Sequence, residues 1–358
     1  MKLGIITYTH GTNIGQRLQN YALQSVCEEL GHQAYTIKQG SPVEKETLRY
    51  RLKKILVAAK YPALKRTHRL RQHKFDDFNN KYIQFYGEEM PFYGDNSHFA
   101  KQFDAFIVGS DQIWSPLSCY VGDNAFLTFA KVNQRLTYAP SLSVETMPAH
   151  KADFYKDRLN GFWNISVREH KGAEIIEKLT GRHAEVLVDP TLLLTRHKWD
   201  QIRENYKDKP STSYILAMFL SSIPDAVRAI ANKLKLKVIL LDDNSVISPA
   251  EFLDLVSDAQ LTLTDSFHAT VFSAIYHIPF INFDRSDYGE TMSSRFETLY
   301  RVMGIKERRW NKVSFMTDWM EMDYKTIDKH IEIERDKSIK FLKKEFGQVY
   351  VGKEDMDF

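Results

Sequence analysis

Short apolar runs rich in β-branched residues alternate with stretches of helical periodicity along most of the chain. This alternation predicts parallel strands joined by crossover helices, and therefore an α/β fold. The expected strands are 2–8, 33–38, 103–110, 135–142, 164–169 and 184–190 in the first half, and 213–220, 237–243, 259–264 and 279–284 in the second. The six strands of the first half are enough for one sheet, and helices are expected at 14–30 and 268–277.

The alternation of expected strands and helices is interrupted once along the chain. Residues 195–210 are polar and end at Pro210, so we place a domain boundary there. The pattern predicts two Rossmann-like domains that face a cleft, a GT-B-like architecture: residues 1–200, residues 201–320, and a C-terminal helix at 321–358 that can pack back on the first domain. In such sheets ligands bind at the carboxyl ends of the strands, so functional residues should follow strands directly.

A long insertion at 41–100 does not fit the first sheet. Its first part, 48–59, has one apolar helical face among arginines and lysines, and Pro62 is expected to end that helix. A second helical pattern spaces Phe75, Phe78, Tyr82 and Phe85 in register, and no acidic residue occurs from 47 to 74. Two interpretations stay open: a basic surface for an anionic lipid head group or acceptor, or a solvated flap whose apolar side packs on the sheet.

Composition adds limits to this picture. The 358 residues carry a net charge of only +3, which favours neither a nucleic-acid-binding surface nor a disordered tail. The two cysteines, Cys27 and Cys119, have no metal-ligand spacing and suggest a reducing compartment. Neither a signal peptide nor a membrane-spanning run is visible, so we expect a cytoplasmic protein with at most peripheral membrane contact through 48–74 at the inner face.

Polar residues follow two of the expected first-half strands. After the first strand, "THGTNIGQRLQ" is a glycine-containing turn into a helix whose amides could hold an anion, with Asn13 and Gln16 placed to reach a cleft. After "DAFIVG" come Ser110, Asp111 and Gln112, either as ligand contacts or as a local turn capped by Asp111.

Two arginines are candidates for binding an anion. Arg168 closes an apolar strand, where its planar donors match the paired oxygens of phosphate or carboxylate; the alternative is an ion pair with a carboxylate of the protein. Arg295 lies near the start of a late helix, where a cation opposes the helix dipole unless an anion binds. Asp189 also closes a strand, but the following Pro190 favours a structural turn.

The stretch "LTLTDSFHATVFSAIYHIPFI" predicts a strand, a sharp turn and a helix. Either Asp265 or Ser266 is expected to cap the helix, and His268 falls in its first turn. The positive end of a helix disfavours an imidazolium and a nearby anionic ligand favours it, which suits general acid or base chemistry. A structural histidine is the alternative.

Five segments in this order resemble the polysaccharide pyruvyl transferase family. They are "GTNIGQRLQNYALQ", "FDAFIVGSDQIW", "ISVREHKG", "VDPTLLL" and "LTDSFHATVFSAIYHIPFI". The resemblance implies a GT-B-like fold and transfer of the enolpyruvyl group of phosphoenolpyruvate to a sugar of a polysaccharide or its precursor, giving a pyruvate ketal and phosphate. The family's catalytic arginine and histidine fall on Arg168 and His268, with Asp111 a candidate for the complementary proton transfer. Some members have an arginine where this chain has Ser266, and we expect Arg295 to replace its charge.

The expected partners follow from this resemblance. Phosphoenolpyruvate is the expected donor substrate, and no cofactor, metal or nucleic acid is expected. The acceptor is expected to be a sugar, and whether it is free, lipid-linked or nucleotide-linked stays open. Two other functions remain compatible with the pattern: a sugar-nucleotide glycosyltransferase of GT-B type, and a non-catalytic glycan-binding protein.

Overall fold

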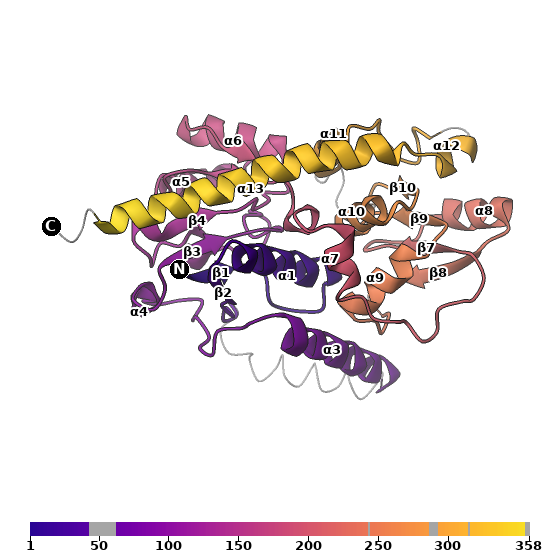
Figure 1. Cartoon of the computed structure of the whole chain (residues 1–358), viewed down its shortest axis with the longest axis horizontal. Helices are drawn as coiled ribbons and strands as arrows, with labels where there is room; N and C mark the ends of the chain where they lie inside the picture. Colours follow the sequence, from indigo (N-terminus) through magenta and orange to yellow (C-terminus); the bar gives the residue numbers. More distant parts are fainter. Residues whose placement is uncertain (43–61, 243, 286–292, 314–315, 355–358) are drawn as a thin grey trace.

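A computed structural model describes residues 1–42, 62–242, 244–285, 293–313 and 316–354 (Figure 1). The strands are β1 (Lys2–Ile6), β2 (Gln33–Thr36), β3 (Ala105–Val108), β4 (Arg135–Thr137), β5 (Ser166–Val167), β6 (Glu185–Val186), β7 (Tyr214–Met218), β8 (Lys237–Leu241), β9 (Leu261–Thr264) and β10 (Phe280–Asn282). The helices are α1 (Ile14–Glu29), α3 (Pro62–Tyr82), α4 (Ser97–Ala100), α5 (Ala149–Leu159), α6 (His170–Thr180), α7 (Arg196–Asp200), α8 (Asp225–Leu234), α9 (Pro249–Ser257), α10 (Phe267–Tyr276), α11 (Ser293–Met303), α12 (Met316–Met320) and α13 (Tyr324–Glu354). Short 3₁₀ helices occur at Asp123–Phe126, Val132–Gln134 and Pro190–Leu192.

Two four-stranded parallel sheets form the centres of two Rossmann-like units. Their strand orders are β2-β1-β3-β4 and β10-β9-β7-β8. Helices connect successive strands and cover the sheets, as parallel pairing requires. The chain is therefore an α/β protein of GT-B-like architecture, and the helical and strand patterns of the sequence predict this class correctly. The predicted domain limits at residues 200 and 320 stay predictions.

The first half differs from the prediction of a single sheet. β5 and β6 pair only with each other among the described strands, beside the end of β4. The reason lies in two hydroxyl side chains between β4 and β5. The Ser166 amide donates to Thr137 Oγ1 at 2.7 Å, and the Ala139 amide donates to Ser166 Oγ at 3.1 Å. These bonds replace the backbone ladder that would have made the sheet continuous.

The two units share one hydrophobic core. Helix α1 of the first unit packs against α9 of the second, and buried side chains of both units form a continuous cluster. Trp199 on α7 is fully buried in it, with its ring 5.7 Å from that of Tyr21 on α1 and 4.8 Å from that of Phe272 on α10. Its indole donates to the Thr191 carbonyl at 3.2 Å. The relative position of the units is therefore fixed by packing as well as by the chain connection.

The insertion contributes one long helix to the described structure. α3 is described from Pro62 onward, and proline is well tolerated in the first turn of a helix. The prediction that Pro62 ends the preceding helix stays a prediction. Phe75 and Phe78 are buried in the shared core, whereas Phe85 lies beyond the helix, in a backbone bridge to Thr36. The predicted helix at 48–59 lies outside the described residues, as does this part of the 48–74 membrane-contact prediction.

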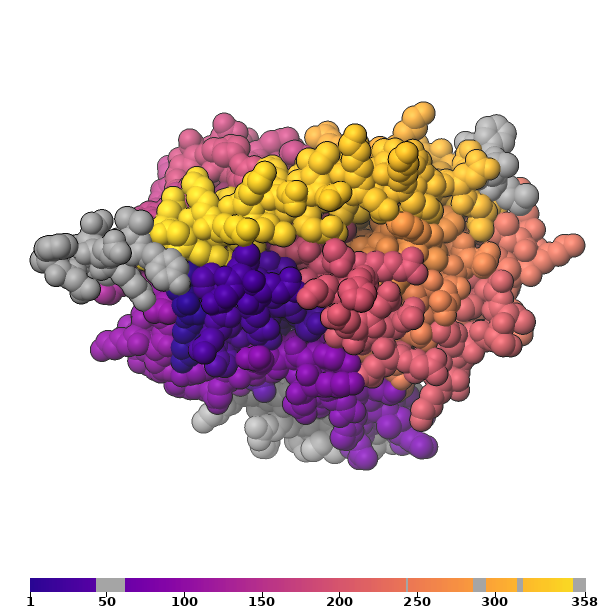
Figure 2. All heavy atoms as spheres, viewed as in Figure 1, coloured from indigo at the N-terminus to yellow at the C-terminus, as the bar shows by residue number. Residues whose placement is uncertain are grey.

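Helix α13 runs along both units and covers their upper face (Figure 2). Near its start Asp328 pairs with His277 of the second unit at 2.9 Å. In its middle, the buried Ser338 hydroxyl accepts from the Val188 amide of the first unit at 3.2 Å. Near its end Glu345 accepts from the Asn164 side chain at 2.7 Å. Within the described residues, no helix combines the length and apolarity needed to cross a membrane.

We predict that Trp199→Ala lowers the free energy of unfolding by about 3 to 5 kcal/mol, because it leaves a cavity where the two units meet. Urea denaturation followed by far-UV circular dichroism measures the change. Trp163→Ala is the matched control, since Trp163 is 48% exposed, and it should change the free energy by less than about 0.5 kcal/mol. An equal decrease in the free energy of unfolding in both variants would contradict the role of Trp199 in packing the two units together.

Candidate active site

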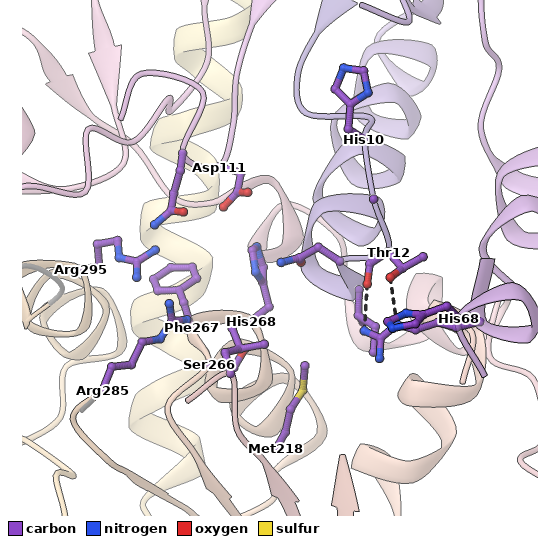
Figure 3. Close-up of a pocket in the computed structure, with 16 residues that line it drawn as sticks. His10, Thr12, His68, Asp111, Met218, Ser266, Phe267, His268, Arg285 and Arg295 are labelled. Atoms are coloured by element: carbon purple, nitrogen blue, oxygen red, sulfur yellow. Dashed lines mark hydrogen bonds between the residues drawn. The ribbon is translucent and has the colours of Figure 1, made fainter. Parts of the chain in front are cut away.

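A cavity of about 410 Å³ lies between the two units at the carboxyl ends of their strands. It is lined by His10, Gly11, Thr12, Asn13, Ile14, His68, Arg71, Asp111, Gln112, Met218, Leu220, Ser266, Phe267, His268, Arg285 and Arg295. Figure 3 shows His268 in the middle, Arg285 and Arg295 to one side of it, and Thr12 and His68 to the other. Three arginines face a single carboxylate, Asp111, among these described residues, so the cavity is cationic.

The loop between β1 and α1 forms one wall of the cavity, and Arg17 holds it in place. Buried beneath the loop, the Arg17 guanidinium donates to the carbonyls of Tyr8, Thr9 and Gly11 at 3.3, 2.6 and 2.7 Å. Burial lowers the pKa of Arg17 to about 10. Asn13 caps α1 by accepting from the Gln16 amide at 3.1 Å.

The loop after β3 carries Ser110, Asp111 and Gln112, but only the last two line the cavity. Ser110 is fully buried, and its hydroxyl donates to the Ala139 carbonyl at 2.6 Å. Asp111 has a φ of 56°, in the left-handed region that costs most residues free energy. Aspartate adopts this region more readily than most residues, and the Asp111 side chain lines the cavity from this position.

A buried carboxylate, Asp189, joins the two residues that the sequence singles out most strongly. Its Oδ2 accepts from Arg168 Nη1 at 2.7 Å and lies 3.6 Å from His268 Nε2, while Oδ1 accepts from the Thr191 amide and hydroxyl at 3.0 and 2.7 Å. Burial alone would raise the pKa of Asp189, but His268 and Arg168 outweigh burial and hold this pKa well below its usual range. Asp189 is therefore ionised and orients both partners.

Arg168 lies behind the cavity wall, with 3% of its surface exposed. Besides Asp189, it has the Asp111 carboxylate 3.5 Å from Nη1 and the Phe267 ring centroid 4.5 Å from its guanidinium carbon. Its Nε and Nη2 have no hydrogen-bond partner among the described residues. Burial would lower the pKa of Arg168, but the neighbouring carboxylates, Asp189 first, raise it.

His268 is placed where the two units touch. It is the second residue of α10, which the Ser266 hydroxyl caps by accepting from the Ala269 amide at 3.4 Å. The imidazole packs against the first turn of α1: a Cβ added to Gly15 would lie only 2.0 Å from its Nδ1. Glycine at position 15 is therefore required for the ring to sit between Asp189 and the cavity.

Arg285 and Arg295 bring further positive charge to the same end of the cavity. Arg295 is 4% exposed, and burial, followed by the charges of Arg168 and Arg285, lowers its pKa. Clustered cations of this kind repel one another, and an anion bound among them would relieve that repulsion. The Arg285 Nε lies 3.4 Å from the Asp265 carbonyl, and the Asp265 carboxylate itself accepts from the Leu220 and Ser221 amides.

The structure brings most of the sequence-predicted residues together. Asn13, Asp111, Gln112, Ser266, His268 and Arg295 line the cavity, Arg168 lies directly behind it, and Gln16 and Ser110 lie outside its lining. The sequence predicts only a structural turn at Asp189, and it gives no indication that Arg71 and Arg285 line the cavity. The position of Asp189 at the end of a strand was the available signal, and Pro190 after it does form a structural turn. Nowhere in the described part of the chain do three or more His, Cys, Asp or Glu side chains gather as a metal site.

We predict that Asp189→Asn lowers the free energy of unfolding at pH 7 by about 3 to 5 kcal/mol, because Arg168 then stays buried without its strongest partner. The folded-state pKa of Asp189 is depressed, so its contribution is present above the unfolded-state pKa of about 3.9 and is lost as the pH falls below it. Urea denaturation at pH 7 and pH 3 should show a smaller difference between wild type and variant at pH 3. A difference that grows on acidification would contradict this assignment.

Solved structures of similar overall topology include two UDP-GlcNAc 2-epimerases. The protein from Methanocaldococcus jannaschii, in complex with UDP-GlcNAc and UDP, is 12% identical with a TM-score of 0.41, and the match covers 93% of this chain and 99% of that one. The protein from Neisseria meningitidis, bound to UDP-GlcNAc, is 9% identical with a TM-score of 0.43, and the match covers 98% and 94%. No curated protein sequence matches the chain.

The family model described as polysaccharide pyruvyl transferase matches residues 13–287, which is more than half of the chain. The matched region contains Asp111, Arg168, Asp189 and His268, the residues that meet at the cavity, whereas Arg295 lies beyond it. The chain therefore belongs to the polysaccharide pyruvyl transferase family.

Proposed function

We propose that the chain transfers the enolpyruvyl group of phosphoenolpyruvate onto a sugar of a polysaccharide or its precursor, forming a pyruvate ketal and releasing phosphate. The observation that carries this proposal is that Arg285, Arg295 and His268 line one cavity, with Arg168 directly behind it. A small donor with a phosphate and a carboxylate needs several fixed cationic donors close together. Proton transfer to this donor requires a titratable side chain close to it, and we assign this role to His268.

The donor is expected at the end of the cavity formed by Ser266, Arg285 and Arg295. Amides of the first turn of α10 add hydrogen-bond donors, and the helix dipole favours negative charge there. Arg168 supports the same anion from behind, through the buried Nε and Nη2 that no described residue engages. In this arrangement Asp189 offsets part of the positive charge of the arginines, and its hydrogen bond fixes the orientation of the Arg168 guanidinium.

The reaction requires C3 of phosphoenolpyruvate to gain a proton, two carbon–oxygen bonds to form at C2, and the bond from C2 to the phosphate oxygen to break. A proton added to the C3 methylene of phosphoenolpyruvate makes C2 cationic, and the oxygen of a sugar hydroxyl bonds to C2. A second hydroxyl oxygen then bonds to C2 as the bond from C2 to the phosphate oxygen breaks. Of the two hydroxyl protons, one restores the acid and the other leaves on phosphate, so atoms and charge balance.

His268 is the proposed acid or base for these proton transfers. It lines the cavity, and its Nε2 lies 3.6 Å from the buried carboxylate of Asp189. Asp111 is the candidate for the complementary transfer, because its carboxylate faces the same cavity from the opposite unit. No cofactor is needed, since the donor itself carries the activated group.

The acceptor is expected on the other side of His268, where Thr12, His68 and Arg71 line the cavity. His68 and Arg71 lie on α3, whose outer turns expose Lys65, Arg66 and Arg69 without an acidic residue. This supports an acceptor with an anionic carrier, a lipid-linked or nucleotide-linked sugar. We further propose that the protein acts in the cytoplasm, with peripheral contact to the inner face of the membrane.

The direct test is to incubate the protein with phosphoenolpyruvate and each class of acceptor, lipid-linked and nucleotide-linked. Phosphate release together with an acceptor mass gain of one pyruvate ketal supports the proposal. Thermal stabilisation by a nucleoside diphosphate but not by phosphoenolpyruvate would instead favour a glycosyltransferase. Sugar binding without phosphate release from any acceptor would favour a glycan-binding protein.

His268→Ala should lower kcat by about 10²-fold or more, because the variant loses its proton donor or acceptor. Phosphate release at saturating phosphoenolpyruvate measures the change. His183→Ala is the matched control, since the His183 side chain is 81% exposed and far from the cavity lining, and it should retain wild-type kcat. Nearly normal turnover in His268→Ala would remove this residue from the mechanism.

Arg295→Gln should weaken phosphoenolpyruvate binding by about tenfold or more, because a charge-assisted hydrogen bond is lost from the donor site. Isothermal titration with phosphoenolpyruvate measures the affinity, and Arg285→Gln tests the second cation in the same way. Arg228→Gln, on the exposed side of α8, is the control. Unchanged affinity in Arg295→Gln would reject the idea that Arg295 replaces the charge missing at Ser266.

A further inference from the structure

The edge strand β8 exposes an apolar strip outside the cavity. Among the described strands β8 pairs with β7 alone, at one end of the second sheet (Figure 1). Val238 and Leu240 are 38% and 41% exposed, although a strand of the sequence Lys-Val-Ile-Leu-Leu has the composition of a buried one. Natural edge strands are usually interrupted by charged residues, proline or bulges, and from Val238 to Leu241 this strand has none of these residues.

The covering helix stops short of this strip. In the register of the sheet, Val238 lies beside Ile215 and Leu240 beside Ala217, so all four side chains share one face. Ile215 and Ala217 are fully buried in the cluster that α8 covers, whereas their β8 neighbours are exposed. The apolar face of the sheet therefore continues past its helical cover.

The backbone groups of the same two residues point to the open edge. Leu241 directs its carbonyl toward β7, where the Phe219 amide donates to it at 3.1 Å. Alternate residues of a parallel strand direct their amide and carbonyl groups to opposite sides, so Ile239 also faces β7. Val238 and Leu240 then present their amides and carbonyls away from the sheet, ready to pair with another strand.

We propose that this β8 edge, Lys237–Leu241, is a self-association surface on which a second copy of the chain adds its own β8 in antiparallel orientation. A two-fold axis at Ile239 places Val238 opposite Leu240 of the second copy, and Leu240 opposite its Val238. Both are hydrogen-bonded pairs of an antiparallel ladder, with apolar side chains side by side on one face. The two sheets then form one continuous eight-stranded sheet, with an α8 on the same face of each half.

The charges at the two ends of the strand fit this antiparallel orientation. Lys235 and Lys237 precede or begin β8, and Asp242 follows it. In the antiparallel pair, the basic end of one copy meets the acidic end of the other, so like charges are kept apart. A parallel arrangement would put lysines opposite lysines. This self-complementarity favours a second copy over an unrelated partner, and it does not depend on the proposed function.

The expected association is weak and reversible, because a five-residue strand pair is a small interface. Sedimentation velocity of the purified full chain from about 1 to 100 μM should show the average mass rising toward twice that of one chain. Val238→Lys/Leu240→Lys should weaken association by about tenfold or more, since charged residues at a sheet edge oppose pairing. Ile333→Lys, at a position on α13 that is 55% exposed, should associate as wild type does.

Hydrogen exchange supplies a second measurement that does not depend on the variant folding well. The amides of Val238 and Leu240 should become protected as concentration rises, whereas that of Ile239, which faces β7, should be protected at every concentration. Leu240→Pro removes the outward amide together with the leucine side chain and should also weaken association. Three results would each overturn the proposal. The wild type could stay monomeric at every concentration, the Val238→Lys/Leu240→Lys variant could associate as the wild type does, or hydrogen exchange at the amides of Val238 and Leu240 could be independent of concentration.

Discussion

The carboxylate of Asp189 is the interaction on which the candidate site depends. It is buried, it keeps its charge because His268 and Arg168 face it, and it is held in turn by Thr191. A single fully buried anion thus decides where an arginine of one unit and a histidine of the other can lie. Loss of Asp189 would leave the buried Arg168 guanidinium without its strongest partner, and an unpaired buried charge is strongly destabilising.

This arrangement needs the two units to keep a fixed separation, and the packing between them provides it. Trp199 fills the space between α1 and α10, and Gly15 allows the His268 ring to lie directly on α1. On the far side, α3 ties the units together through Arg71, which donates to Thr12 of one unit and to the Asp242 carbonyl of the other. The cavity is therefore preformed, and its floor is part of the shared core.

The sequence predicts the fold class and most of the cavity because the relevant signals are local. Strand and helix periodicity places His268 in a first helical turn and Asp111 after a strand, and both line the cavity. What the sequence does not reveal depends on contacts between distant segments. The sequence predicts that Asp189 belongs to a turn, and the structure confirms this. Its contacts with Arg168 and His268 become visible only in the folded structure, because these residues are distant in the sequence. The sequence predicts that Arg168 either binds an anionic ligand or forms an ion pair with a carboxylate of the protein. The structure shows the ion pair, and the Nε and Nη2 donors of Arg168 have no hydrogen-bond partner among the described residues. The separation of β5 from the first sheet likewise depends on two hydroxyl groups that periodicity does not register.

Helix α13, which follows both units in the sequence, contributes to the surroundings of Asp189. The Ser338 hydroxyl on this helix accepts a hydrogen bond from the amide of Val188, the residue next to Asp189. Until α13 docks on the first unit this hydrogen bond cannot form, so folding of each unit on its own does not complete the surroundings of the buried carboxylate.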